Sequence, residues 1–168
     1  YGNFLFVPDI GLSTEEELNI VDLNLFSETK KPYLFGWPHY EGTINNGIKY
    51  NEIFLQINDQ SININNYIFE NTIMPKVYYQ HQAPQNFRPA IIGGEVVADV
   101  NSKYYEHYLF ADYMSNELFA YDFKNDFLSI VPLDNLGGFI TSVAIHPNKS
   151  NTVMITTGSG NLVEILLP

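Results

Sequence analysis

The sequence contains no cysteine and has little positive charge. The lack of cysteine excludes disulfide bonds, a thiolate nucleophile and cysteine-ligated zinc. Eight Lys and Arg residues stand against nineteen Asp and Glu residues, which gives a formal net charge of −11. A field of this sign repels phosphate-rich partners and argues against nucleic-acid binding. No apolar run approaches the roughly 20 residues that a membrane-spanning helix needs, so we expect no membrane partner.

Helical patterns are scarce as well. No stretch of the chain shows a sustained 3.6-residue period of apolar side chains. Twelve Tyr, twelve Phe and many Val and Ile residues favour strands. Hydrophobic residues make up 45% of the chain, enough to bury a core. The composition therefore predicts an all-β fold.

A repeat in the C-terminal half indicates which all-β fold this is. Two short apolar segments, Tyr108–Ala111 and Leu118–Tyr121, flank a polar loop, which is typical of a β-hairpin. Val153–Thr156 and Leu162–Ile165 flank a second such loop. The two hairpins are about 45 residues apart, which is the length of one four-stranded propeller blade. We therefore predict part of a β-propeller, with about two and a half to three blades.

The predicted strands give one complete blade and one that lacks a strand. The first blade comprises residues 91–98, 108–114, 117–123 and 128–133, and the second only 139–146, 153–157 and 162–167. A blade one strand short is expected where a propeller ring closes. Two to three blades cannot close a ring and leave strand edges unpaired. We expect a missing propeller half, or a second copy of the chain, to cover these edges.

The N-terminal half is less regular. The chain begins as if inside a strand, which suggests that it starts within a longer protein. Strands are predicted at Phe4–Val7 and Leu18–Leu23, separated by a loop that holds Glu15 to Glu17. Residues 24–74 are rich in Asn and Ile and are predicted to form a long inserted loop region within a single domain, 1–168. Such a loop either shapes a binding surface or reflects compositional bias alone.

Several motifs occur in an order that resembles a known family. They are Val7–Gly11 followed by Glu16–Val21, Phe35–Pro38 with Glu41-Gly42, Ala90–Gly94, Tyr108–Ser115, and Ile140–Val143 with Gly160–Leu162. This order resembles the soluble aldose sugar dehydrogenases, also called glucose/sorbosone dehydrogenase-like propellers. The resemblance implies the C-terminal half of a six-bladed propeller that oxidises aldoses with pyrroloquinoline quinone (PQQ) and calcium. It also implies a periplasmic or secreted location.

The resemblance places part of the chemistry elsewhere. In the family the catalytic base is a histidine in the N-terminal half of the propeller, so no catalytic residue is expected in this chain. Some members carry a Lys in the turn that corresponds to Tyr113–Asn116 and Arg residues near Phe139–Thr141. Neither segment of this chain contains a cation, and cations are what would pair with PQQ carboxylates. The cofactor-binding residues of this chain are therefore unknown.

Calcium is the second cofactor that the resemblance implies. Glu17 matches a family calcium ligand, with the carbonyl of Phe35 nearby in the motif. The carbonyls of Gly11 and Leu12 match a second position beside the cofactor. Oxygen ligands of these kinds suit calcium. The alternative interpretation is that Glu15 to Glu17 are solvated loop charges.

Two further residues are candidates for substrate binding. His81 matches a Tyr-x-His motif on the substrate-facing side of the family, and otherwise would be a hydrogen-bonded loop histidine. Trp37 would stack on a sugar face, or would serve as a core anchor between blades.

Two functions follow from these observations. The chain is either part of a PQQ- and calcium-dependent sugar dehydrogenase, or part of a non-catalytic propeller that has lost the cofactor and binds carbohydrate or protein. The order of the motifs supports the family in general, whereas Met114 and the missing arginines favour the second alternative.

Overall fold

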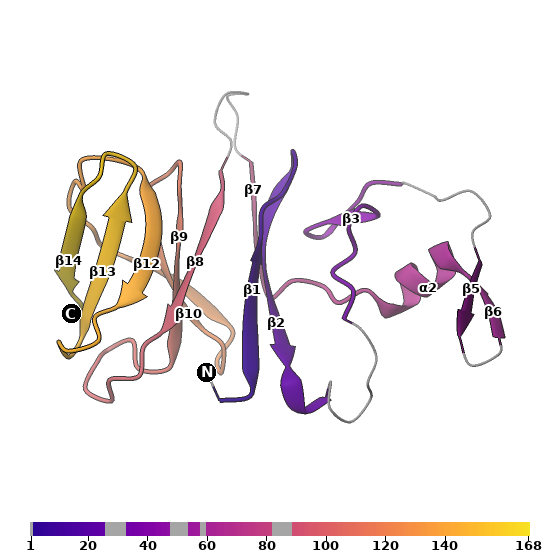
Figure 1. Cartoon of the computed structure of the whole chain (residues 1–168), viewed down its shortest axis with the longest axis horizontal. Coiled ribbons are helices and arrows are strands. Elements are labelled where there is room, and N and C mark those ends of the chain that lie inside the picture. Colours follow the sequence, from indigo (N-terminus) through magenta and orange to yellow (C-terminus); the bar gives the residue numbers. More distant parts are fainter. Residues whose placement is uncertain (1, 26–32, 48–53, 58–59, 82–88) are drawn as a thin grey trace. The chain divides into compact units, whose positions relative to one another are not determined.

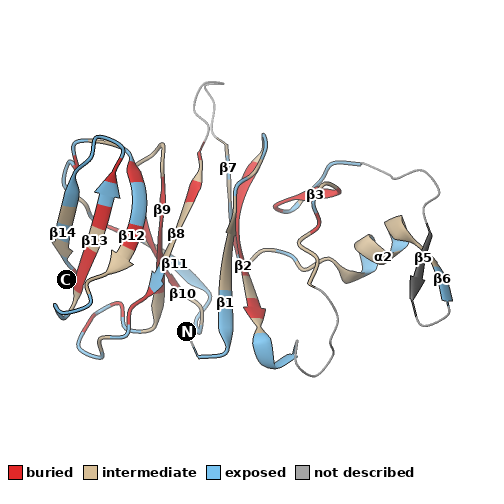
Figure 2. Ribbon diagram, in the orientation of Figure 1, coloured by how far each residue is buried: buried red, intermediate tan, exposed pale blue. Residues whose placement is uncertain are grey.

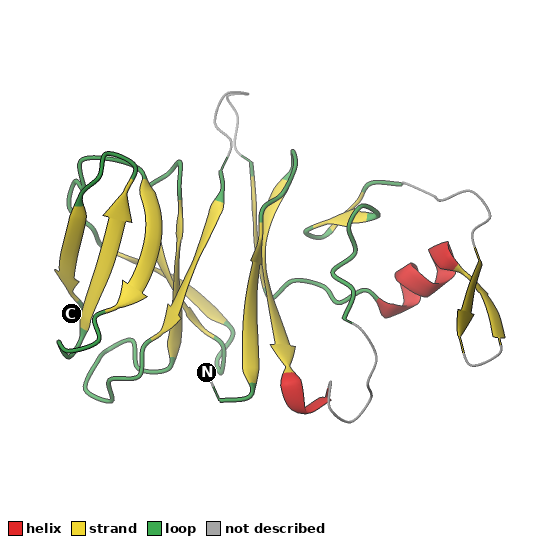
Figure 3. Ribbon diagram, in the orientation of Figure 1, coloured by secondary structure: helices red, strands yellow, loops and turns green. Residues whose placement is uncertain are grey.

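The computed structural model describes residues 2–25, 33–47, 54–57, 60–81 and 89–168 (Figure 1). The chain divides into two compact units, Tyr1–Gln80 and His81–Pro168. Nearly all regular elements are strands (Figure 3). In the described part of the chain, no helix is both long enough and apolar enough to cross a bilayer.

The first unit contains a three-stranded antiparallel sheet in the order β1-β2-β7. Its strands are β1 (Phe4–Asp9), β2 (Glu15–Asp22) and β7 (Val77–Gln80). Glu15 to Glu17 lie inside β2 and are buried, so the prediction that they form a loop was wrong. The strand begins earlier than expected because Asp9 pairs with Glu17 and Glu15 pairs with Gln80.

The rest of the first unit consists of short elements. Two small hairpins join β3 (Tyr40–Glu41) to β4 (Ile44–Asn45) and β5 (Phe54–Ile57) to β6 (Gln60–Asn63). They are followed by α2 (Ile64–Asn71), which the sequence did not predict. The side chain of Asn63 caps α2 by accepting a hydrogen bond from the N–H of Asn65, as Asn does at many helix starts. The helix was missed because eight residues are too few to show a clear period.

The second unit begins with a four-stranded antiparallel meander. Its strands are β8 (Ile91–Val96), β9 (His107–Asp112), β10 (Leu118–Asp122) and β11 (Phe127–Val131), in the spatial order β11-β10-β9-β8. All four strands of the predicted first blade are thus confirmed. The carboxylate of Asp112 accepts hydrogen bonds from the N–H groups of Met114 and Ser115 and so fixes the β9–β10 turn.

A three-stranded sheet completes the second unit, as predicted. It contains β12 (Ile140–Ile145), β13 (Thr152–Thr157) and β14 (Leu162–Leu166), in that order. Apolar side chains of the two sheets form one core, which is visible as buried segments of β9, β12 and β13 in Figure 2. Its fully buried members include Leu109, Leu118, Ile140, Val153 and Ile155.

Candidate cation site

One face of the β1–β2 pair gathers oxygen-bearing side chains. Asp9 and Glu17 are direct cross-strand partners, and directly opposed residues of an antiparallel pair project to the same face. Asn19 lies two residues beyond Glu17 on the same strand, so its side chain shares that face. Glu17 is only 5% exposed and Asn19 is fully buried. The first unit therefore buries two oxygen-bearing side chains beside Asp9.

The hydrogen bonds of this group are incomplete. Oε2 of Glu17 and both side-chain polar atoms of Asn19 are buried without a hydrogen bond of normal geometry. Burial, followed by the charge of Asp9, raises the pKa of Glu17 to about 7, and the nearby Asn19 amide and Gly42 N–H only partly offset this. Burial also raises the pKa of Asp9. A buried carboxylate without a full set of donors favours a proton or a cation.

Glu41 holds the loop that precedes β2. Its Oε1 accepts hydrogen bonds from the N–H groups of Ser13 at 2.6 Å and Thr14 at 2.7 Å, with a longer one from Glu15 at 3.4 Å. Burial alone would raise the pKa of Glu41, but these donors outweigh burial and leave it below its ordinary value. Glu41 therefore stays ionised and ties the loop to the β3–β4 hairpin.

Glu15 makes the reciprocal connection. Its Oε2 accepts hydrogen bonds from the N–H of Thr43 at 2.7 Å and from the hydroxyl of Thr43 at 3.0 Å. Gly42 has a φ of +61°, and a Cβ at this position would lie 2.2 Å from Oε2 of Glu15. Only glycine allows this close approach. Two buried carboxylates thus join the loop before β2 to the β3–β4 hairpin: Glu41 of the hairpin accepts hydrogen bonds from the loop, and Glu15 of β2 accepts them from the hairpin.

The predicted calcium ligands are only partly brought together. Gly11 and Leu12 belong to the loop that Glu41 holds, and a Cβ on Gly11 would lie 1.8 Å from the carbonyl oxygen of Glu15. Glu17 follows in β2. Phe35 lies in another segment, whose neighbour Leu34 accepts a hydrogen bond from the N–H of Ile73. Among the described residues, no three His, Asp or Glu side chains are placed to share a metal ion, so carbonyl and amide oxygens would have to complete a shell.

The predicted sugar-binding residues lie in different units. Trp37 is 54% exposed in the first unit. It precedes a cis bond to Pro38. Next to it, Nε2 of the buried His39 lies 3.2 Å from Oδ1 of Asn65 at the start of α2. His81 is half-buried at the start of the second unit.

An aromatic contact involves the turn at Tyr113–Asn116, where some members of the family that the sequence resembles carry a Lys. The rings of Tyr113 and Phe139 lie 5.1 Å apart between centroids. The N–H groups of Met114 and Ser115 donate hydrogen bonds to the carboxylate of Asp112. Oδ1 of Asn116 accepts a hydrogen bond from the N–H of Ile140. This turn offers no cation to a PQQ carboxylate. Residues 113–116 and 139–141 therefore lack the cations that, by the resemblance, would pair with the carboxylates of PQQ.

Three residues of the candidate cation site in the first unit, Asp9, Asn19 and Glu41, were not recognised from the sequence. No sequence motif marks Asp9 or Asn19 as a ligand. Asn19 lies two residues after Glu17 on the same strand, and the pairing of Asp9 with Glu17 is known only from the structure. Glu41 belongs to the Glu41-Gly42 motif, which by itself does not indicate that the Glu41 carboxylate binds a distant loop. The adjacent Gly42 was the available signal, because glycine readily adopts the positive φ of a tight turn, as Gly42 does here.

Comparison with known proteins gives one solved structure of interest. No family model and no curated protein matches the chain. The chain is similar to the PQQ-bound form of aldose sugar dehydrogenase from Streptomyces coelicolor, with a TM-score of 0.53 and 16% identity. The match covers 96% of this chain and 39% of that chain, so this chain spans about two fifths of the length of the enzyme. At this identity the likeness shows the fold alone.

The chain is part of a β-propeller. The antiparallel meander β8–β11 and the shorter sheet β12–β14 are two of its blades. The propeller is sugar dehydrogenase-like in its fold.

Proposed function

We propose that this chain is the calcium-binding part of a sugar dehydrogenase-like propeller, with Glu17 as the carboxylate ligand. The observation that carries the proposal is the buried Glu17 carboxylate: its Oε2 makes no direct hydrogen bond, and the nearby Asn19 amide and Gly42 N–H only partly offset its burial. Calcium accepts carboxylate, amide and carbonyl oxygens. Asp9 and Asn19 supply such oxygens on the same sheet face, and Gly11 and Leu12 add carbonyls from the loop that Glu41 fixes.

Calcium titration of the purified chain tests this proposal. Isothermal calorimetry is expected to show binding by the wild-type chain and at least a tenfold loss of affinity in Glu17→Gln. Glu164→Gln is the matched control, because Glu164 is a surface carboxylate of the second unit that bonds to Lys149. Circular dichroism checks that both variants fold. Equal calcium affinity in Glu17→Gln, or no binding by the wild-type chain, would contradict the proposal.

We further propose that the propeller binds an aldose, with Trp37 and His81 as contacts. The half-exposed indole of Trp37 suits stacking on the apolar face of a sugar ring. Trp37 is the only Trp in the sequence, so its fluorescence reports on this position alone. An aldose that binds there is expected to shift the emission, and the shift should saturate with concentration. Unchanged emission with a panel of aldoses would remove Trp37 from the binding surface.

Oxidation of the aldose with PQQ is the proposed activity of the whole protein. The similarity in fold to the PQQ-bound aldose sugar dehydrogenase from Streptomyces coelicolor supports this proposal. The alternative is a propeller that binds carbohydrate or protein without the cofactor. The absence of Lys and Arg from residues 113–116 and 139–141 favours that alternative. A periplasmic or secreted location belongs to the same proposal.

The two activities are separated by one assay on the complete protein. PQQ and calcium are added, and dye reduction is followed with several aldoses. Turnover with any aldose would establish the dehydrogenase. Aldose binding by Trp37 fluorescence, without PQQ binding and without turnover, would establish the alternative.

A further inference from the structure

Three segments of the second unit meet at one end of its strands: the β9–β10 turn, the start of β12 and the β13–β14 turn (Figure 1). The N–H of Gly158 donates to the carbonyl of Phe139 at 2.8 Å. The N–H of Ile140 donates to Oδ1 of Asn116 at 2.9 Å. The ring contact of Tyr113 with Phe139 joins the first two segments again. We call the resulting surface, which comprises residues 113–116, 139–141 and 156–161, the turn face.

A β-bulge places a hydroxyl group on the turn face. Ile140 of β12 pairs with Thr157 of β13. Ser142 pairs with the next residue, Thr156, so Thr141 is an extra residue in β12. Bulges of this kind re-aim a side chain. The Thr141 hydroxyl lies 3.0 Å from that of Thr156, and both residues are exposed. The turn face thus presents two threonine hydroxyls to solvent.

Gly158 leaves an open place on the same face. A Cβ on this residue would lie 3.9 Å from Oη of Tyr113 and 3.9 Å from Cγ2 of Thr141. The carbonyl oxygen of Phe139 would lie at the same distance. These are ordinary van der Waals distances, and the φ of Gly158 is outside the left-handed region. A side chain would therefore fit here, and without one the space is open to a ligand group.

The chemistry of the turn face suits an uncharged sugar ring. Phe139 is 43% exposed, and an exposed aromatic ring packs well against an apolar surface. The hydroxyl groups of Tyr113, Thr141 and Thr156 can each donate and accept a hydrogen bond. The turn face contains no Asp, Glu, Lys or Arg. A ligand that carries carboxylates would find no cation among these residues, whereas a neutral ring with hydroxyl groups would find both kinds of contact.

We propose that the turn face binds an uncharged pyranose, which stacks on Phe139 and forms hydrogen bonds with the hydroxyls of Tyr113 and Thr141. A hydroxyl or hydroxymethyl group of the sugar occupies the open place at Gly158. This site rests on the proposed binding of carbohydrate by the propeller and deepens it. It lies wholly within the second unit, so it can be tested separately from Trp37.

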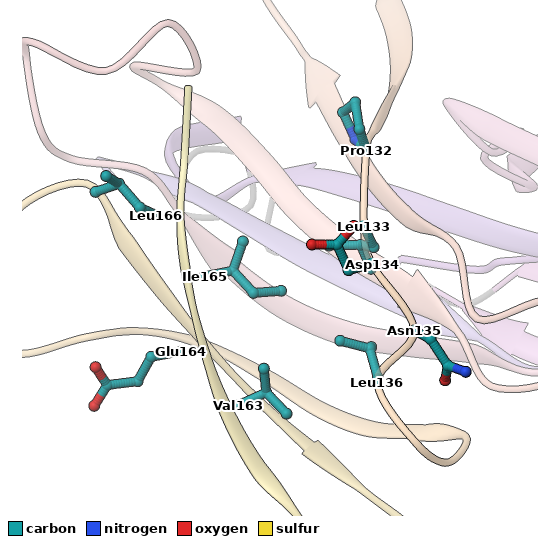
Figure 4. A pocket seen from close by; sticks show the side chains of 9 residues that line it. All are labelled: Pro132, Leu133, Asp134, Asn135, Leu136, Val163, Glu164, Ile165 and Leu166. Carbon is teal, nitrogen blue, oxygen red and sulfur yellow. The ribbon is translucent and has the colours of Figure 1, made fainter.

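A cavity of the second unit has a different lining and supplies a control position. Its volume is about 430 Å³, and it lies between β14 and the segment that follows β11 (Figure 4). The nine residues that line it include no aromatic ring and no hydroxyl group. Val163, Ile165 and Leu136 are among them. A sugar ring would have no stacking partner there, so we expect Ile165 not to respond to the sugar.

NMR titration of the isotope-labelled chain tests the site. The probes are the methyl β-glycosides of glucose, galactose and mannose, which are uncharged and whose blocked anomeric carbon prevents its oxidation. At least one of them is expected to shift the amide signals of Phe139, Thr141 and Gly158, with saturation at concentrations up to about 50 mM. The amide signal of Ile165 is expected to stay unchanged.

Variants of Phe139 test the stacking contact. Phe139→Ala removes the ring and is expected to lower the glycoside affinity about tenfold or more. Phe139→Tyr keeps a ring and is expected to change the affinity less than about threefold. Phe127→Ala is the matched control, because Phe127 is 61% exposed and pairs with Asp122 at the opposite end of the strands. Circular dichroism checks that each variant folds.

Variants of Gly158 test the open place without touching the ring. Gly158→Leu fills the space, and its Cβ meets no atom closer than 3.9 Å, so the fold is expected to persist. We expect the glycoside affinity to fall about tenfold or more in Gly158→Leu, and less in the smaller Gly158→Ala. Wild-type affinity in a folded Gly158→Leu would contradict the placement of the sugar.

Three further results would overturn the proposal. One is the absence of a saturable shift with all three glycosides. The second is an equal affinity of Phe139→Ala and Phe127→Ala. The third is a set of shifts confined to the first unit, which would leave the proposed contact at Trp37 standing. Shifts at Phe139 with unchanged Trp37 emission would instead support the turn face and remove Trp37 from the binding surface.

Discussion

The two units bury different kinds of side chain, although both are built on antiparallel sheets. The second unit packs an apolar core between its two sheets, with Leu109, Leu118 and Ile155 fully buried. The first unit buries the carboxyl groups of Glu15, Glu17 and Glu41 in one region. Burial of apolar surface stabilises without further conditions, whereas a buried carboxylate needs donors or a cation. The stability of the second unit is therefore expected to depend on apolar packing. The stability of the first unit is expected to depend on the hydrogen bonds that Glu41 and Glu15 accept, which we call the carboxylate clamp.

The largest effect is expected from a cavity in the apolar core. Leu118→Ala should lower the free energy of unfolding by about 3 kcal/mol, because a fully buried leucine loses its packing and leaves a cavity. Leu162→Ala is the matched control, since Leu162 has the equivalent place in the next hairpin but is 64% exposed. Urea denaturation measures both. Equal losses in the two variants would contradict the core assignment.

The second largest loss of stability is expected when the carboxylate clamp of the first unit is broken at Glu41. Glu41→Ala leaves the N–H groups of Ser13 and Thr14 without their acceptor, which should cost about 2 kcal/mol. Glu41→Gln keeps an acceptor oxygen and should lose less. Thermal unfolding and limited proteolysis near residues 11–15 measure the effect. If alanine and glutamine behave alike and neither destabilises, the clamp does not hold the loop.

A pH series is expected to separate the two units further. The ordinary pKa of Glu17 is 4.5, and it is about 7 in the folded chain. Between these values the folded state holds the proton more tightly than the unfolded state, so the contribution of Glu17 to stability falls as pH rises through this window. Without calcium, Glu17→Gln should be more stable than wild type at pH 8, by on the order of 1–2 kcal/mol.

The same comparison below pH 4 supplies the control. There the carboxyl is protonated in both states, and wild type and Glu17→Gln should unfold alike. A Glu17→Gln variant that is less stable than wild type at pH 8 in a chelating buffer would show that the carboxylate has donors that satisfy it.

The smallest effect is expected at the turn between β9 and β10. Asp112 is buried, and its second oxygen accepts a hydrogen bond from the N–H of Ala90. Asp112→Asn keeps an acceptor for Met114 and Ser115 but places an amide against that N–H, which should cost about 1 kcal/mol. Chemical denaturation measures it. A loss as large as that of Leu118→Ala would mean that polar contacts dominate the second unit as well.

The C-terminal half could be predicted closely because its signals are local. The alternation around Phe110 and Ile155 and the turns that follow them define the hairpins without any knowledge of distant contacts. The prediction failed at Glu15 to Glu17, since three successive glutamates carry no strand signal. It also failed at α2, which is short and begins in an Asn-rich run.

The sequence by itself determined the strands of the second unit, the 45-residue repeat and the division into a four-stranded and a three-stranded sheet, because these depend on the two-residue period and on turn residues. Only the tertiary structure decided that Glu15, Glu17 and Glu41 are buried. The donors that satisfy Glu41 lie 27 and 28 residues away in the chain. No local pattern encodes a hydrogen bond over that separation, so the candidate cation site becomes visible only when the hairpin and the strand meet.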